Sequence, residues 1–350
     1  MSAPIKKADI TPSVSLAISA FNEEEILPRK LENARSLDYP NHLVKIAVIS
    51  DGSTDKTNEI IHHFAEQSNK ITPCISQQHK GKTACLNEFV PNLRGEIILF
   101  SDANSFYDKN VIRRIVRPFV DPDIGFVTGS TKYVSPSKDN SEDATGFYSR
   151  LERWTKSLET RTGSCVGADG AVFAMRKTFF SALQPEDIND LVIPFHVISQ
   201  GYRGMLEPSV FCTEEFAGRT AEFKRQVRIT NRTLRAIFNH NHLLNPFQYP
   251  LFAFKLFSHK IMKFLTPFFL LILLITNGFL AFGDIAFYKV TLVLQVLFYF
   301  FSLVGLLRTK KHKSKLIGIC GMFLTVNVAY FMGWIEYLIG KRYTSWKPSR

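Results

Sequence analysis

The chain has 350 residues and a formal net charge of +12, because 43 Lys and Arg stand against 31 Asp and Glu. This length is ample for a buried core, which excludes a mini-protein held together by disulfides. With 45% hydrophobic and 21% charged residues, 19 Gly and 16 Pro, the composition also excludes a disordered tail and a collagen-like or low-complexity chain. Of the 31 Phe residues, 15 lie at or after Phe247. The composition therefore predicts two chemically different parts rather than one water-soluble globule.

The cysteines and the N-terminus point to the cytosol. The five Cys residues form no C-x-x-C pair, have no His at zinc-ligand spacing and are odd in number. They fit a reducing environment for most of the chain. The first 21 residues lack the unbroken apolar core of a signal peptide, so we expect no export signal there.

From Ser13 to about Asn245, short apolar segments rich in β-branched residues alternate with amphipathic segments. This alternation is typical of βαβ units on a mainly parallel sheet. Buried strands are predicted over residues 14–19, 44–50, 96–100, 125–129 and 172–175, with helices after Asn22, Ser53, Lys80 and Asp108. Asn22 lies three residues before Glu25, as in a capping box. Ser53 or Thr54 can cap the second helix.

Beyond Pro246 the chain changes to long apolar segments. Residues 264–282, 290–307 and 316–335 carry no charged side chain, and each is close to the roughly 20 residues that cross a bilayer. Residues 246–263, just before them, place Lys255, His259, Lys260 and Lys263 three or four positions apart among Phe and Leu. This spacing predicts either an interfacial amphipathic helix on the membrane surface or the start of the first crossing.

The basic residues of this region predict an orientation but leave one conflict. Residues 308–315 hold five Lys and Arg, so the positive-inside tendency places this loop, and the domain two crossings before it, in the cytosol. The tail, residues 341–350, holds four more, yet a third crossing would place it on the opposite side. Either the third segment does not fully cross, or the surface helix does, or the tendency fails here. We predict a multi-pass protein of the cell membrane, inner or plasma. Its cytosolic domain would cover residues 1–245 and its interfacial helix residues 246–263. A membrane region with about three helices would follow over residues 264–340, and residues 341–350 would form a basic tail.

Two predicted strands end in polar side chains. The strand in VISDGSTDKT leads directly into Asp51, at the edge of an open α/β sheet where ligands bind. Its carboxylate can accept hydrogen bonds from a base or ribose, although an ordinary turn before a helix explains the same pattern. A second strand ends at Asp102 and Asn104, whose oxygens suit a hard divalent cation that also binds a diphosphate. The pair of strand ends indicates a nucleotide site.

These motifs, in this order, resemble the family 2 glycosyltransferases with a GT-A fold. The resemblance rests on FNEEE at 21–25, SDGSTDKT at 50–57, GKTACLN at 81–87 and SDAN at 101–104, and it continues through GADGAVFAMRK, NDLVIP, GYRGMLEP and EFKRQVRI to SHKIMKFLTP. The resemblance covers nearly the whole chain. Within the family, the chain is similar to the membrane-bound branch that includes polysaccharide synthases. It implies an α/β fold of the GT-A type, Rossmann-like with a mainly parallel sheet, followed by a C-terminal α-helical transmembrane region.

The resemblance also implies roles for individual residues. The base and ribose of the nucleotide would be bound by Ala20, Phe21, Glu23 and Asp51, and Lys82 would lie near the nucleotide. Asp102 and Asn104 would bind a Mg²⁺ or Mn²⁺ ion. Arg225 and Arg228 would contact the diphosphate. Asn104 stands where many relatives have a second Asp, so the metal keeps an oxygen ligand but loses one charge. Ile229 stands where the Q-x-x-R-W motif of the synthases has Trp, an acceptor-stacking platform, so processive extension does not follow.

The general base in this fold is a carboxylate deeper in the chain. Glu186, Asp187 and Asp190 are the candidates, and the match to NDLVIP selects Asp190. A positioned carboxylate can take the proton from an acceptor hydroxyl as it attacks, although Asp190 could also simply cap a helix.

Two further groups carry alternatives. Gly167, Asp169 and Gly170 are predicted to line the acceptor pocket, or to form only a turn before the next strand. Arg232 and Arg235 follow Arg228 on one helix face and could rest on anionic lipid headgroups.

The sequence therefore predicts an inverting hexosyltransferase. It would move a sugar from a nucleotide-diphosphate sugar, with a UDP-sugar favoured, to a lipid-linked or polysaccharide acceptor at the cytosolic membrane face, in cell-surface or extracellular polysaccharide biosynthesis. The alternative is a non-catalytic membrane subunit that binds nucleotide sugar as a sensor or in assembly. Membrane lipids and other polysaccharide assembly proteins are expected partners. Nucleic acid is not, because membrane orientation accounts for the nine basic residues in the loop after Leu307 and the tail.

Overall fold

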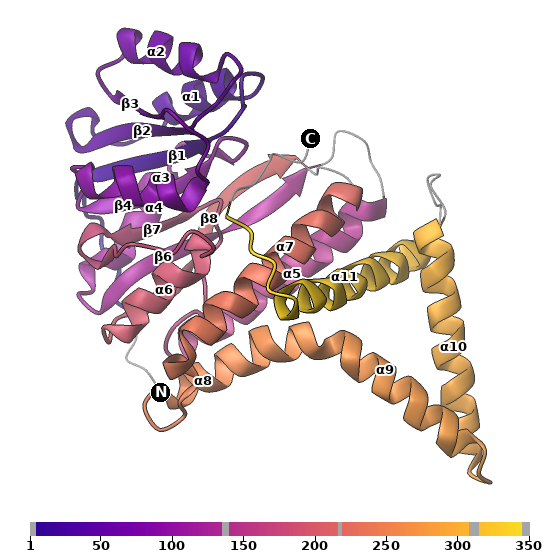
Figure 1. Ribbon diagram of the computed structural model, residues 1–350. Coiled ribbons are helices and arrows are strands. Elements are labelled where there is room, and N and C mark those ends of the chain that lie inside the picture. The colour runs from indigo at the N-terminus through magenta and orange to yellow at the C-terminus, as the bar shows by residue number, and fades with distance from the viewer. Residues whose placement is uncertain (1–4, 135–139, 216–218, 308–314, 345–350) are drawn as a thin grey trace.

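The computed structural model describes residues 5–134, 140–215, 219–307 and 315–344 (Figure 1). Within them, eight strands form one sheet in the order β3-β2-β1-β4-β7-β6-β8-β5. The strands are β1 (Val14–Ala20), β2 (Val44–Asp51), β3 (Ile71–Ser76), β4 (Ile97–Asp102), β5 (Phe106–Tyr107), β6 (Ile124–Val134), β7 (Phe173–Arg176) and β8 (Arg203–Glu215). Strands β1 to β4 are parallel and β6 is parallel to β8, whereas β7 is antiparallel to both β4 and β6. The predicted mainly parallel α/β sheet is confirmed.

Helices cover both faces of the sheet. They are α1 (Leu27–Arg35), α2 (Thr57–Gln67), α3 (Lys82–Phe89), α4 (Val111–Val116), α5 (Asn140–Arg161), α6 (Asn189–Ser199) and α7 (Arg219–Asn239). All seven side chains of β1 are buried, and successive residues such as Leu16 and Ala17 join different apolar clusters on opposite faces. A strand covered on both faces reads as a continuous apolar run and not as an alternating one. This is why β1 was recognisable in the sequence.

The predicted helix caps are wrong. Helix α1 begins at Leu27, five residues after Asn22, and Asn22 itself has φ of +52°. Its side-chain Oδ1 accepts a hydrogen bond from the backbone N–H of Thr54 at 2.8 Å, so it ties the loop after β1 to the loop after β2. The first turn of α2 is instead met by Asp55, whose Oδ1 accepts from the N–H of Thr57 at 3.0 Å. The parallel neighbours β1 and β2 bring these two loops together, and this long-range contact takes the place of a local cap.

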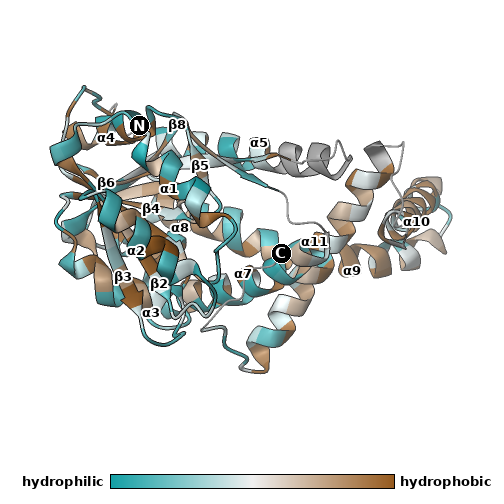
Figure 2. Cartoon of the chain, turned by 90° about the horizontal axis from the view of Figure 1, so that it is seen from above, coloured by the Kyte–Doolittle hydropathy of each residue, from teal (hydrophilic) through white to brown (hydrophobic). Residues whose placement is uncertain are grey.

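The C-terminal region is a set of long helices. They are α8 (Pro250–Leu256), a short π-helical segment (Phe257–Ile261), α9 (Met262–Ala281), α10 (Ala286–Leu307) and α11 (Lys315–Leu338). Three of the described helical stretches are long and apolar enough to cross a membrane, and they run over Pro250–Ala281, Ala286–Leu306 and Ile317–Leu338. Figure 2 shows hydrophobic residues spread over α9 and α10, which extend away from the sheet. The predicted membrane region is thus present as three such helices.

The segment over 246–263 is continuous with the first of these helices but is also part of the N-terminal domain. Phe252, Leu256 and Ile261 are buried in the same apolar cluster as α3 and α6. The Lys255 ammonium group donates hydrogen bonds to the backbone oxygens of Glu159 at 2.9 Å and Ser164 at 3.2 Å. One face of this segment therefore packs on the N-terminal domain.

Helix α11 returns to the N-terminal domain. It packs beside α7 and α5 (Figure 1), and a Cβ at Gly333 would lie 2.6 Å from the side chain of Thr230 on α7. Just beyond α11, the backbone oxygen of Lys341 accepts hydrogen bonds from Asn231 at 3.1 Å and Arg235 at 2.6 Å. Both ends of the helical region therefore lie against the same domain.

Candidate active site

A cleft of about 1580 Å³ opens at the carboxyl ends of β1 and β4 and continues to the C-terminal helices. Its walls include the sequence-predicted residues Glu23, Lys82, Asp102, Asn104, Gly167, Asp169, Gly170, Asp190, Arg225 and Arg228. Ala20, Phe21 and Asp51 line a separate small pocket, of about 10 Å³, that shares Lys82 with the large cleft. The fold thus brings together residues that lie more than 200 positions apart in the chain.

Asp51 is buried and holds the loop that precedes α3. Its carboxylate accepts hydrogen bonds from the backbone N–H groups of Lys80 at 2.8 Å and Gly81 at 2.9 Å, and lies 3.0 Å from Nδ1 of His79. Gly52 is required beside it, because its φ is +64° and a Cβ would lie 2.3 Å from the backbone nitrogen of His79. The ring of Phe21 stacks on His79 with centroids 3.9 Å apart. Asp51 therefore fixes the loop before α3, which forms one wall of the predicted nucleotide pocket.

Asp102 lies at the end of β4, where the sequence predicted it. Its Oδ1 is 2.5 Å from the Nζ of Lys82, the first residue of α3. The carboxylate is partly exposed, with 30% of the side chain accessible, and Asn104 lines the cleft two residues further on. Within the described ranges no group of three or more His, Cys, Asp or Glu side chains could hold a metal by itself. Two oxygen donors at a cleft wall fit a hard cation that takes its remaining ligands from a bound diphosphate.

Asp190 lies in the first turn of α6 and faces the loop over residues 167–170. Its backbone oxygen accepts a hydrogen bond from the N–H of Ala168 at 2.8 Å, and a Cβ at Gly170 would lie 3.1 Å from its carboxylate Oδ2. Burial raises the pKa of Asp190, against the opposing effect of Lys82 and Lys260. A carboxyl group with a raised pKa, beside a glycine loop that leaves room in front of it, has the properties of a general base.

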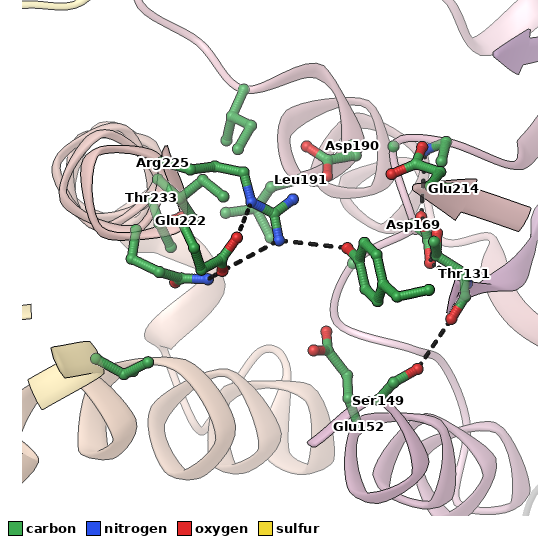
Figure 3. Close-up of a pocket in the computed structure, with 18 of the residues that line it drawn as sticks. Thr131, Ser149, Glu152, Asp169, Asp190, Leu191, Glu214, Glu222, Arg225 and Thr233 are labelled. Atoms are coloured by element: carbon green, nitrogen blue, oxygen red, sulfur yellow. Dashed lines mark hydrogen bonds and ion pairs between the residues drawn. The ribbon is translucent and has the colours of Figure 1, made fainter. Parts of the chain in front are cut away.

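Asp169 is placed at the cleft, but its carboxylate is occupied. It accepts hydrogen bonds from the backbone N–H of Thr131 at 2.8 Å, from the hydroxyl of Thr131 at 2.9 Å and from the N–H of Ala171 at 3.2 Å. These bonds join the loop over residues 167–170 to β6. Figure 3 shows Asp169 turned toward Thr131, with Asp190 on one side and Glu214 on the other.

Helix α7 supplies the cationic wall. Arg225 pairs with Glu222 at 2.9 Å and donates to the hydroxyl of Tyr133 at 3.3 Å (Figure 3). Burial and the neighbouring charge of Arg225 lower the pKa of Arg228, which also lines the cleft. An arginine on the cleft wall can bind an anionic ligand such as a diphosphate.

The two arginines after Arg228 make hydrogen bonds within the protein. Arg232 donates hydrogen bonds to the backbone oxygen of Glu186 at 3.0 Å and the hydroxyl of Thr83 at 3.1 Å, so it braces the loop before Asp190. Arg235 donates to the backbone oxygen of Lys341. Both guanidinium groups thus bind within the protein, Arg232 at the loop before Asp190 and Arg235 at the segment that follows α11, and a lipid contact of these arginines stays a prediction.

Several residues of the cleft were not predicted from the sequence to lie there. Glu214, on β8, is buried close to Asp102, accepts a hydrogen bond from Ser105 at 2.5 Å, and burial raises its pKa to about 7. Lys156 on α5 and Lys260 beyond α8 line the other end. Lys260 was placed by the sequence only in the amphipathic segment 246–263 and in the motif SHKIMKFLTP, with no role at the cleft, and Lys156 belongs to no short motif. Only the pairing of β8 with β6 and the packing of α5 bring them to the site.

The fold and this cleft define the class of protein: an α/β domain of the GT-A fold that is followed by long apolar helices. The mannosyltransferase from Pyrobaculum calidifontis, solved in complex with GDP-Man and Mn²⁺, has a similar structure, with a TM-score of 0.68 over 97% of this chain and 92% of that chain. The two share 17% sequence identity, so the likeness shows the fold alone.

Residues 15–183 match the model of glycosyl transferase family 2, and the chain therefore carries a family 2 glycosyltransferase domain. The beta-monoglucosyldiacylglycerol synthase of a Nostoc species is 31% identical over 131 residues, which are 37% of this chain and 28% of that protein. The poly-beta-1,6-N-acetyl-D-glucosamine synthase of Staphylococcus aureus is 25% identical over 216 residues, which are 59% of this chain and 52% of that protein. The match thus spans about half or less of these relatives. The family resemblance stated from the motifs is confirmed.

Proposed function

We propose that the chain is an inverting glycosyltransferase that takes a sugar from a nucleotide-diphosphate sugar, with a UDP-sugar favoured, and passes it to a lipid-linked or polysaccharide acceptor in polysaccharide biosynthesis. One observation carries the proposal. The carboxylate of Asp190 lines the same cleft as Lys82, Asp102 and Arg228, so a proton acceptor and a diphosphate-type site share one space.

The chemistry assigned to each residue follows from its surroundings. Asp190 takes the proton from the acceptor hydroxyl, and its raised pKa makes it a stronger base than an exposed Asp. Arg228 stabilises the negative charge that develops on the departing diphosphate. Lys82 and the loop held by Asp51 form the nucleotide end. Gly170 leaves space for the acceptor in front of Asp190.

A divalent cation, Mg²⁺ or Mn²⁺, is part of the proposal. Asp102 and Asn104 would hold it, and when bound it would neutralise charge on the leaving diphosphate. The ion pair between Lys82 and Asp102 occupies one of these oxygens, so the cation and the nucleotide must displace or share it.

The arrangement of the helices supports a membrane topology. Because the start of α8 and the residues after α11 both contact the N-terminal domain, the chain crosses a membrane an even number of times between them. We assign the two crossings to α9 and α10, with α11 on the near side against α7 and α5. The basic residues at 308–315 and 341–350 then share one side, which we propose is the cytosol, and the conflict in the sequence disappears.

The test is transfer by the purified full chain in detergent with Mn²⁺ and a panel of nucleotide sugars, measured as released nucleoside diphosphate. One donor is expected to be turned over, and Asp190→Asn should lower turnover by about 100-fold or more, with the donor still bound. Asp38→Asn removes an exposed carboxylate paired with Arg113 and serves as the matched control. Donor binding without turnover in the unmodified protein would favour the non-catalytic subunit.

A further inference from the structure

A lysine of helix α1 is hydrogen-bonded to the loop that carries Asp102 and Asn104. The side chain of Lys30 has no accessible surface, although Lys is among the residue types that are least often fully buried. Its ammonium group donates hydrogen bonds to the hydroxyl of Ser101 at 2.8 Å and to the backbone oxygen of Ser105. These two serines stand on either side of the predicted metal-binding residues in the sequence. Lys30 therefore joins the two ends of the loop.

The loop is a tight turn that further hydrogen bonds fix. The backbone N–H of Ser105 donates to the backbone oxygen of Asp102 at 3.2 Å. The N–H of Ala103 donates to the backbone oxygen of Ser19 on β1, also at 3.2 Å. The hydroxyl of Ser105 donates to the carboxylate of Glu214 on β8 at 2.5 Å. The turn is thus bonded to β1 at its middle, and to β8 and α1 at its end.

Helix α1 also contacts the strand that follows the turn. Asn33 donates from Nδ2 to the backbone oxygen of Tyr107 at 2.8 Å and accepts from the N–H of Tyr107 at 3.0 Å. The ammonium group of Lys30 lies 4.0 Å from the centre of the Tyr107 ring, where the ring attracts a cation. Asn33 and Lys30 are three positions apart and therefore share one face of the helix. This face contacts the segment 101–107 at Ser101, Ser105 and Tyr107.

The burial of this ammonium group costs free energy. Burial lowers the pKa of Lys30 from the ordinary value of 10.5 to about 7, against the opposing effect of neighbouring acidic groups that include Asp102. An apolar side chain of similar length would fill the same space without this cost. The packing of α1 therefore does not require an ammonium group, whereas the turn uses its hydrogen bonds.

We propose that Lys30 and Asn33 are positioning residues for the divalent cation, because they hold the turn after β4 in the shape that places Asp102 and Asn104 on one wall of the cleft. Lys30 is buried and is not among the residues that line the cleft, so it acts through the backbone on either side of the two ligands. Loss of a group that holds metal ligands in place weakens metal binding by about 10–100-fold. This inference rests on the proposed function, which assigns the cation to Asp102 and Asn104.

The direction of the change in Mn²⁺ affinity separates positioning from charge. Mn²⁺ alone is titrated into the purified full chain in detergent, and the free ion is measured by electron paramagnetic resonance. Lys30→Met removes a positive charge near the site, and this effect by itself would tighten Mn²⁺ binding. Positioning predicts the opposite, so that Mn²⁺ binds Lys30→Met about tenfold or more weakly. Tighter or unchanged binding overturns the proposal.

A second buried lysine supplies the matched control. Lys255 also donates to two oxygens of the chain, those of the Glu159 and Ser164 backbone, and it does not line the cleft. Lys255→Met thus removes a buried ammonium group in the same way but far from β4, and it should leave Mn²⁺ affinity unchanged. An equal loss of affinity in the two lysine variants would mean a general loosening of the fold and would overturn the proposal.

Asn33→Ala tests the same role without a change of charge, and it decides the question if Lys30→Met does not fold. It should weaken Mn²⁺ binding, because β5 then loses two hydrogen bonds to α1. Asn87→Ala is its control, since Asn87 on α3 makes the same pair of bonds with the backbone of Leu183, at 2.7 and 2.9 Å. Weaker Mn²⁺ binding in Asn33→Ala alone supports the proposal, and equal affinities of the two Asn variants overturn it.

Asp102→Asn separates this inference from the proposed function. The unmodified chain is expected to bind Mn²⁺, and Asp102→Asn to bind it more weakly. If this holds while Lys30→Met and Asn33→Ala bind Mn²⁺ normally, the proposed metal site stands and the positioning role is overturned. If the unmodified chain binds no Mn²⁺, or Asp102→Asn has no effect, the metal site of the proposed function and this inference are overturned together.

Discussion

Gly170 lies directly against the carboxylate of Asp190, so that a Cβ at position 170 would be 3.1 Å from Oδ2 and 3.4 Å from Cγ. A methyl group at this distance must push the carboxylate or the loop by a few tenths of an ångström. Because the carboxylate is the proposed base, the space in front of it is part of the reaction geometry.

Gly170→Ala is therefore expected to lower kcat about tenfold or more with little effect on the KM for the donor, since misplacement of a reacting group acts on the chemical step. Steady-state kinetics with varied donor concentration check this. Gly278→Ala, on α9 with nothing within 4 Å of the new Cβ, is the control and should leave kcat unchanged. A raised donor KM with normal kcat in Gly170→Ala would remove Gly170 from the acceptor side.

The pH dependence of sugar transfer should reflect the protonation of Asp190. Because burial raises its pKa in the folded protein, Asp190 is protonated, and inactive as a base, up to a higher pH than an exposed Asp. The rate should thus fall on the acid side at a pH above about 4, the range of an ordinary Asp. An acid limb at or below the ordinary value would argue that another group is the base.

The ion pair of Lys82 with Asp102 predicts competition with the metal. Lys82→Met removes a positive charge next to the proposed cation, so Mn²⁺ should bind the donor-free protein a few-fold more tightly, as measured by electron paramagnetic resonance. Asp102→Asn should weaken Mn²⁺ binding instead. Indifference of Mn²⁺ affinity to both changes would place the cation elsewhere.

Glu214 predicts a pH-dependent stability. Its pKa of about 7 in the folded protein lies above the ordinary Glu value of 4.5, so the folded state binds more protons between these values and loses stability as pH rises through them. Glu214→Gln removes this loss and should stabilise the protein by roughly 1–3 kcal/mol at pH 8 and by far less at pH 4. Chemical unfolding at the two pH values tests it; an equal effect at both would show that Glu214 is not forced to ionise in the fold.

The even number of crossings can be tested by labelling single cysteines, since the five native Cys side chains are buried. Ile339→Cys, after α11, should react with a membrane-impermeant maleimide from the same side as Glu66→Cys on α2. Gly283→Cys, between α9 and α10, should react only from the opposite side. Opposite sides for positions 339 and 66 would mean that α11 crosses as well.

Much of this site could be predicted from the sequence because it lies in short local motifs. Asp51 and Asp102 come at the ends of apolar strands that are buried on both faces, and such strands can be recognised in a sequence without any knowledge of the fold. Strand β3 was missed because Pro73 interrupts it at the sheet edge, where a missing N–H is tolerated. Strand β8 was missed because it carries Pro208 and a register shift opposite Thr128 and Ser130.

By itself, the sequence determined the family, the sheet with its polar strand ends, and the three apolar helices, since each depends on neighbours in the chain. Only the tertiary structure decided that Asn22 ties two loops together, that Arg232 braces the loop before Asp190, and that α11 returns to the domain. It also decided that the cleft ends among Lys156, Lys260 and Lys263, whose charges meet only when α5 packs against the start of the membrane region. Their electrostatic energy depends on distances in space, which the order of residues does not contain.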